Sequence, residues 1–123
     1  MYKYKADYTN TFKMLTMDDL QDSPMYGKED FNNWYKKWNE RLTRQDESKE
    51  ESLNLMKKNN PAVIPRNHRV EEALKHAVED GDYSYMNNLM EVLKNPYEYS
   101  KEQEEYSKLP PKCNTPYRTF CGT

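Results

Sequence analysis

The sequence is poor in aliphatic side chains, and this scarcity bounds the kind of core it can build. Ile, Leu, Val and Phe together supply 17 of the 123 residues, below the share of about 20% at which disorder becomes a concern. Eleven Tyr, seven Met and two Trp compensate, because their large side chains can cover a small core. The near balance of 19 basic and 21 acidic residues also removes the self-repulsion of most disordered chains. We therefore expect a single domain, or part of one, whose thin apolar layer leans on something absent from this chain.

Other absences exclude whole classes of partner. No sustained basic run provides the electrostatic footprint of a nucleic-acid-binding protein. No apolar run approaches the roughly 20 residues that cross a bilayer, and Met1 to Lys5 lead into no signal-like apolar core. The three glycines are scattered, so no phosphate-binding loop can be drawn. The sequence predicts a cytoplasmic protein with no nucleic-acid partner, no membrane partner and no nucleotide site of its own.

Residues that could hold a metal are few, and the abundant carboxylate pairs have no evident apolar pocket that would raise a pKa for acid-base work. Cys113 and Cys121 are too few for a disulfide framework and lack the partners of a tetrahedral zinc site. His68 and His76, if helical, point about 80° apart and lie about 12 Å apart along the axis, so they are no metal pair. Carboxylates such as those of Glu47–Glu51 alternate with lysine and are typical of a solvated surface. We expect no catalytic, cofactor-binding or metal-ligating residue here.

The stretch from Asn59 to Arg69 organises the chain, and at its centre lies the proline-bounded segment Pro61–Pro65. Proline disfavours the α conformation in the residue before it, so Asn60 and Ile64 should be extended and a preceding helix should stop by Asn59. Val63 and Ile64 then have no helical face to join and are expected to fill a gap between helices. Asn67, a preferred N-cap type, should begin the next helix. An ordinary interhelical linker accounts for all of this geometry.

Apolar periodicity and capping signals predict an all-α fold of about five short helices in a small irregular bundle. Ser48 and Glu51 form the pattern of a capping box. Residues 97–123 should be mostly irregular, with one plausible short helix at 101–107. The predicted helices cover residues 7–15, 28–45, 48–59, 67–80 and 83–94.

The helix at 28–45 should bury an aromatic ridge. Its apolar side chains fall within an arc of roughly 80°. A pair of tryptophans can also stack on bases or sugars, but helical spacing along one stripe favours a core role. The ridge consists of Phe31, Trp34, Trp38 and Leu42.

The helices at 67–80 and 83–94 should form a tight hairpin. Gly81 is placed for the left-handed position after the first helix, and Asp82 can cap the second. Ala73 and Ala77 would let the two helices approach closely. The expected apolar faces comprise Val70, Ala73, Leu74, Ala77 and Val78 on the first helix, and Met86, Leu89, Met90 and Leu93 on the second.

Cys121 lies third from the end of the sequence and can be interpreted in two ways. An accessible terminal thiol suits redox exchange. A tail whose cysteine has no role is the simpler reading, and chemistry alone favours it.

Several segments, taken in order, resemble the end of the selenoprotein O family of pseudokinase-like protein adenylyltransferases. The most specific is the run from Asn60 to His68, Asn-Pro-Ala-Val-Ile-Pro-Arg-Asn-His, and the resemblance spans about Asp7 to Thr123. The other segments are Asp7–Phe12, Trp38–Leu42, Gly81–Asp82, Leu93–Tyr97 and Cys121–Thr123.

The resemblance implies a C-terminal helical part of an enzyme that transfers AMP from ATP to Ser, Thr or Tyr hydroxyls of proteins. The kinase-like catalytic domain, with its ATP and Mg²⁺ (or Mn²⁺) sites, would lie upstream in the same polypeptide. Family members carry cysteine or selenocysteine third from the end, so Cys121 would form a regulatory disulfide with a cysteine of the catalytic region. Cys113 matches no family position and receives no role.

A different class remains open. The Tyr- and Met-rich composition also suits a small stand-alone helical module that docks a protein partner.

Overall fold

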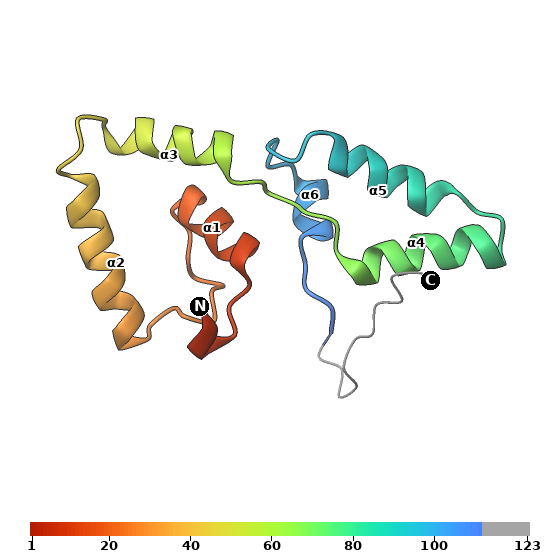
Figure 1. Ribbon diagram of the computed structural model, residues 1–123, viewed down its shortest axis with the longest axis horizontal. Coiled ribbons are helices and arrows are strands. Elements are labelled where there is room, and N and C mark those ends of the chain that lie inside the picture. Colours follow the sequence, from red (N-terminus) through yellow and green to blue (C-terminus); the bar gives the residue numbers. More distant parts are fainter. Residues whose placement is uncertain (112–123) are drawn as a thin grey trace, which may run out of the picture. The chain divides into compact units, whose positions relative to one another are not determined.

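The computed structural model describes residues 1–111, and all the regular elements in this range are helices (Figure 1). This confirms the predicted all-α class, and no strand occurs in that range. The elements are the 3₁₀ helix η1 (Tyr2–Tyr4) and the α-helices α1 (Tyr8–Met17), α2 (Glu29–Leu42), α3 (Lys49–Asn59), α4 (Asn67–Glu79), α5 (Ser84–Lys94) and α6 (Lys101–Tyr106).

The chain divides into two compact units. Unit 1 is Met1–Ala62, with η1 and α1 to α3, and unit 2 begins at Val63, with α4 to α6. The division falls inside the proline-bounded segment. This is the physical reason for it, because neither proline ring supports a helix that could continue from one unit to the next.

Three helices begin at a residue whose side chain accepts a hydrogen bond from a free backbone N–H of the first turn. Asp7 accepts a hydrogen bond from the Asn10 N–H at 2.8 Å and starts α1. The predicted capping box is confirmed at α3, where Ser48 and Glu51 satisfy each other's backbone N–H groups. Ser100 forms a second capping box, with Gln103, and starts α6.

Two predicted caps are displaced by one residue. Arg66, not Asn67, is the N-cap of α4, and Asn67 is the first helical residue. The N-cap of α5 is Tyr83, while Asp82 accepts a hydrogen bond from the Ser84 N–H at 2.9 Å. The residue type indicates a helix start to within a residue or two, but the exact N-cap position depends on the conformation of the preceding turn.

The C-termini of α1 and α2 also differ from the predicted ranges. α1 continues past Leu15 to Met17 and ends at Asp18, which adopts the left-handed conformation with φ 54°. α2 ends at Leu42, before the predicted end at Gln45, and Thr43 caps it. No glycine marks this C-cap, and aspartate is one of the residue types that tolerate the left-handed conformation.

The core of unit 1 is built from α1, the connection after it, and α2. Leu15, Leu20, Met25 and Phe31 are buried together. α1 also packs against α3. The partly buried side chains around this core include Tyr4, Phe12, Tyr35, Trp38 and Met56.

The aromatic ridge on α2 is less buried than its periodicity predicted. Phe31 is buried, but Trp34 is 45% exposed and Trp38 is partly exposed. The rings still associate, with centroid distances of 5.6 Å from Phe31 to Trp34 and 6.1 Å from Trp34 to Trp38. The ridge spans an arc of about 80° on α2, and α1 and Met25 cover only part of that arc. The rest of the ridge therefore stays exposed.

Unit 2 contains the predicted hairpin, in which α4 and α5 pack side by side and antiparallel (Figure 1). Gly81 adopts φ 66°, which confirms its left-handed position after α4. α6 packs against α5. Between Val63 and Pro111, the buried side chains are those of Val63, Ala73, Leu89, Val92, Gln103 and Ser107.

Three apolar side chains assigned to the inner faces of this hairpin are exposed instead. Leu74 is half exposed, Val78 is 83% exposed, and Met90 is 54% exposed. Val92, which the pattern omitted, is buried. Two packed helices bury only a narrow stripe of side chains on each other, so part of each predicted apolar face stays exposed. α6 packs against α5 as well, and the apolar pattern of the hairpin cannot indicate which side of α5 it covers.

The proline-bounded segment behaves as predicted at its first residues. Asn60 is extended, with φ −104° and ψ 115°. Val63 is almost fully buried, and Ile64 is partly buried. This stretch is therefore an anchor as well as a connection.

Candidate functional site

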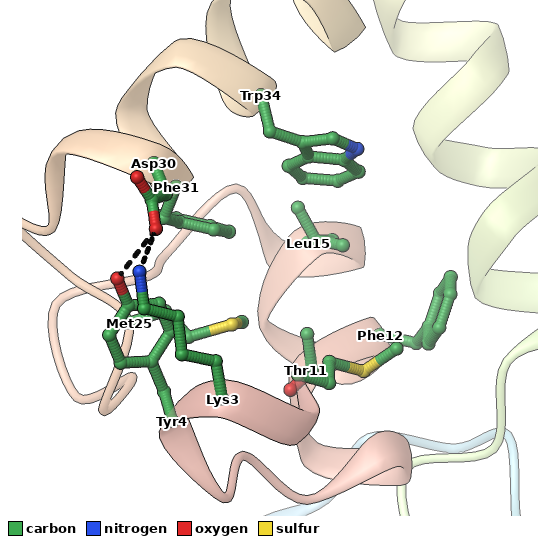
Figure 2. Close-up of a pocket in the computed structure, with 10 residues that line it drawn as sticks. Lys3, Tyr4, Thr11, Phe12, Leu15, Met25, Asp30, Phe31 and Trp34 are labelled. Carbon is green, nitrogen blue, oxygen red and sulfur yellow. Dashed lines mark hydrogen bonds and ion pairs between the residues drawn. The ribbon is translucent and has the colours of Figure 1, made fainter.

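Unit 1 contains an apolar hollow (Figure 2). Its volume is about 360 Å³. Side chains reach it from η1, α1, the connection before α2, and the first turns of α2. The lining residues are Met1, Lys3, Tyr4, Thr11, Phe12, Leu15, Met25, Asp30, Phe31 and Trp34, and we call this hollow the unit 1 pocket.

Charged groups lie only at the edge of the unit 1 pocket. The Lys3 ammonium forms an ion pair with the Asp30 carboxylate, which also accepts a hydrogen bond from the Tyr4 hydroxyl at 3.1 Å. The Lys3 hydrogen bond, followed by that of Tyr4, lowers the pKa of Asp30, and the same contact with Asp30 raises the pKa of Lys3. Both groups are well exposed, so the pair ties η1 to the start of α2 without a large gain in stability.

The interior of the pocket offers contact rather than chemistry. Phe31 and Leu15 form its buried floor, and Trp34 forms an accessible wall. The α1 hydroxyl that lines the pocket, that of Thr11, donates to the Asp7 carbonyl at 2.6 Å and is thereby held in place. The shape and lining of the pocket suit an apolar group, and no nucleophile or base is poised among its lining residues.

A second group of charges, in unit 2, ties α4 to α6. The Arg69 guanidinium lies 3.2 Å from Glu72 and 3.1 Å from Glu105, and it covers the Tyr106 ring at 5.3 Å from the centroid. The Glu105 pKa is lowered, chiefly by its hydrogen bond from Lys108. Because the guanidinium already meets two carboxylates, this cluster serves structure better than anion binding.

The two histidines are used separately, and no group of three metal-ligating side chains occurs within residues 1–111. His76 places Nδ1 2.8 Å from Asp80 and stacks on Tyr85, with the centroids 4.0 Å apart. Burial and the neighbouring Arg69 lower the pKa of His68. His76 therefore fixes the end of α4 against the start of α5.

Two polar contacts that sequence reasoning missed explain parts of the recognised motifs. The Asn60 amide donates to the Thr16 hydroxyl at 3.0 Å and so links the start of the proline-bounded segment to α1. The buried Gln103 amide donates to the carbonyls of Val92, at 3.3 Å, and Asn95, at 2.5 Å, at the end of α5. The capping-box pattern of Ser100 and Gln103 was the available signal for the second contact.

The one site residue proposed from the sequence, Cys121, lies outside the described residues, as does Cys113. In the described part, no helix is long and apolar enough to cross a membrane.

The described residues thus form a small helical protein with an apolar hollow in unit 1. Its sequence matches the family model for protein adenylyltransferase SelO over residues 1–94, from η1 to the end of α5. The chain therefore belongs to this family, as the motifs in the sequence indicated.

Curated relatives agree with this assignment. The chain is 61% identical over all 123 residues to the protein nucleotidyltransferase YdiU of Clostridium botulinum (strain 657 / Type Ba4). It is 59% identical over the same length to the proteins of that name in Bacillus cereus (strain ATCC 10987 / NRS 248) and Bacillus thuringiensis (strain Al Hakam). The match covers the whole chain but about a quarter, 25%, of the length of each relative.

Proposed function

We propose that this chain is the helical, non-catalytic C-terminal part of a longer, cytoplasmic protein adenylyltransferase. The enzyme would transfer AMP from ATP to Ser, Thr or Tyr hydroxyls of protein substrates. The observation that carries the proposal is the 61% identity over the whole chain to a protein nucleotidyltransferase of which the match covers only 25%. The partner of this chain is then the kinase-like catalytic domain of the same polypeptide.

The proposal assigns ATP and Mg²⁺ (or Mn²⁺) to that catalytic domain. AMP transfer needs a metal and basic side chains to neutralise phosphate charge while a hydroxyl attacks the α-phosphate in line. The basic groups with the most organised surroundings here, Arg69 and Lys49, are already paired with carboxylates. Their role under this proposal is to hold the helices that support the catalytic domain.

We further assign a regulatory role to Cys121. Its thiol and one in the catalytic region would form a disulfide, losing two protons and passing two electrons to an oxidised thiol compound such as a small-molecule disulfide. Because the cytoplasm keeps most thiols reduced, such a bond would act as a switch rather than as a structural staple.

The proposal is tested with the polypeptide of the complete reading frame, incubated with candidate substrate proteins and ATP. Label placed on the α-phosphate should become attached to protein, while label on the γ-phosphate should not. Attachment of γ-label would indicate a kinase instead. Absence of both labels, across divalent metals and in reducing conditions, would contradict the assignment.

A stand-alone interaction module is the second candidate, favoured by the unit 1 pocket and the half-exposed Trp34. A purified partner unrelated to any kinase-like domain, bound through this surface, would support it over the first.

A further inference from the structure

The unit 1 pocket is an apolar surface that the described residues leave uncovered. Trp34 is 45% exposed on its wall although it stacks on Phe31 and Trp38. Tryptophan is among the most favourable residues to desolvate at an interface, because its large ring gains contact area at a small cost in side-chain entropy. A half-exposed indole beside a hollow is therefore well suited to contact a docking partner.

We propose that the remainder of the longer adenylyltransferase polypeptide docks on the unit 1 pocket and fills it with an apolar side chain. This inference rests on the proposed function. It is supported by the length of the relatives that lies outside the match, because the match covers only 25% of their length. The aliphatic-poor composition points the same way, since this unit gains apolar contacts by packing on further structure.

Under the proposed function, a tethered occupant is favoured over a separate protein. Met1 is itself one of the residues that line the pocket. If the catalytic region precedes this chain, as proposed, it leaves from the edge of the hollow. A tethered group at that distance reaches an effective concentration of about millimolar, which makes docking easy to maintain with modest contacts.

The edge of the pocket is organised to receive such a group. The Lys3–Asp30 ion pair and the Tyr4 hydroxyl hold η1 against the start of α2, on one side of the opening (Figure 2). Because these charges are satisfied by each other, the incoming surface needs no charged counterpart there. The chemistry that fits is an aliphatic or aromatic side chain, with the volume of about 360 Å³ setting its limit.

Oxidative footprinting of the complete polypeptide tests the inference without any substitution. Hydroxyl radicals oxidise indoles in proportion to their exposure, and mass spectrometry compares Trp34 with Trp38 in the same molecule. The described residues expose Trp34 more than Trp38. Docking should bring the ratio of the two oxidation rates to one or below, whereas a ratio that stays above one would overturn the proposal. The unfolded polypeptide in urea, in which the two rates should converge, is the control.

Two further outcomes separate the possible failures. Protection of Trp34 that appears only as the protein concentration rises would mean that a second copy covers the pocket, and it would overturn the proposal. AMP transfer with an accessible Trp34 would refute the docking inference alone. A protected Trp34 at low concentration, without AMP transfer, would support docking and refute the proposed activity.

Discussion

The side-chain amide of Gln103 donates a hydrogen bond to the backbone carbonyl of Asn95 at 2.5 Å, and so closes the end of α5 from within α6. Gln103 is 1% exposed, and its amide also donates to the Val92 carbonyl. Its oxygen accepts from the Ser100 N–H at 3.1 Å. One buried polar side chain therefore satisfies both a helix C-terminus and a helix N-terminus.

Replacing this side chain should destabilise unit 2 strongly. Gln103→Met keeps the approximate volume but leaves the Val92 and Asn95 carbonyls without this donor in a buried place. The free energy of unfolding should fall by at least about 2 kcal/mol. Urea denaturation followed by circular dichroism measures it, with the exposed neighbour changed in Glu102→Met as the control. Equal stabilities of the two variants would show that water replaces the amide.

The contact between α1 and the proline-bounded segment gives a second prediction. Thr16 donates its hydroxyl to the Phe12 carbonyl at 2.7 Å and accepts from the Asn60 amide. Thr16→Val preserves shape but removes both bonds, and it should cost about 1 to 2 kcal/mol of the free energy of unfolding. Thr43→Val removes a similar bond, to the Glu40 carbonyl, on an exposed helix end and should cost less. A larger loss in the control would contradict the assigned role of Thr16.

The stability of unit 1 should fall in acid because of Asp18. Its carboxylate lies 2.5 Å from the Lys49 ammonium and accepts from the Tyr35 hydroxyl at 2.7 Å, and these bonds, that of Lys49 first, lower its pKa. A lowered folded-state pKa contributes stability that is present above the unfolded value of about 4 and is lost as the pH falls through the folded value.

The matched variant for this prediction is Asp18→Asn. It keeps an acceptor for Tyr35 and tolerates the left-handed backbone at this position, so unfolding midpoints should depend less on pH below about 4. Asp22→Asn, at an exposed neighbour, should leave the original slope. Identical slopes in the wild type and Asp18→Asn would exclude this ion pair as the source.

The redox role of Cys121 is tested in the complete polypeptide. Oxidation should produce a faster-moving band on a non-reducing gel, because an internal disulfide makes the denatured chain more compact. Cys121→Ser should abolish the shift and Cys113→Ser should retain it. A shift that survives Cys121→Ser, or one that depends on Cys113, would refute the assignment.

Local signals in the sequence predicted the helical class and several details of the fold. The Ser48–Glu51 capping box and the left-handed Gly81 depend on a few neighbouring residues, and both occur as expected. The pattern of Asn60 and Pro61 likewise indicates extended backbone, because the restriction acts between adjacent residues.

What could not be predicted depends on neighbours far away in the sequence. The periodicity of α2 cannot show that Phe31 is buried while Trp34 stays half exposed, since that depends on how much of the ridge α1 covers. The exposure of Val78 likewise depends on how much of the α4 surface its neighbouring helices cover. The pocket is a still longer-range feature, because residues of η1, α1 and α2 meet only after unit 1 has folded.

The boundary between the units at Ala62 and Val63 has a kinetic consequence. Each unit closes its helix contacts within about half of the chain, and in unit 2 most helix packing joins sequence neighbours, α4 with α5 and α5 with α6. Chains dominated by short-range contacts acquire their structure rapidly. During synthesis, which proceeds from the N-terminus, the first unit can therefore assemble while the ribosome is still translating the second.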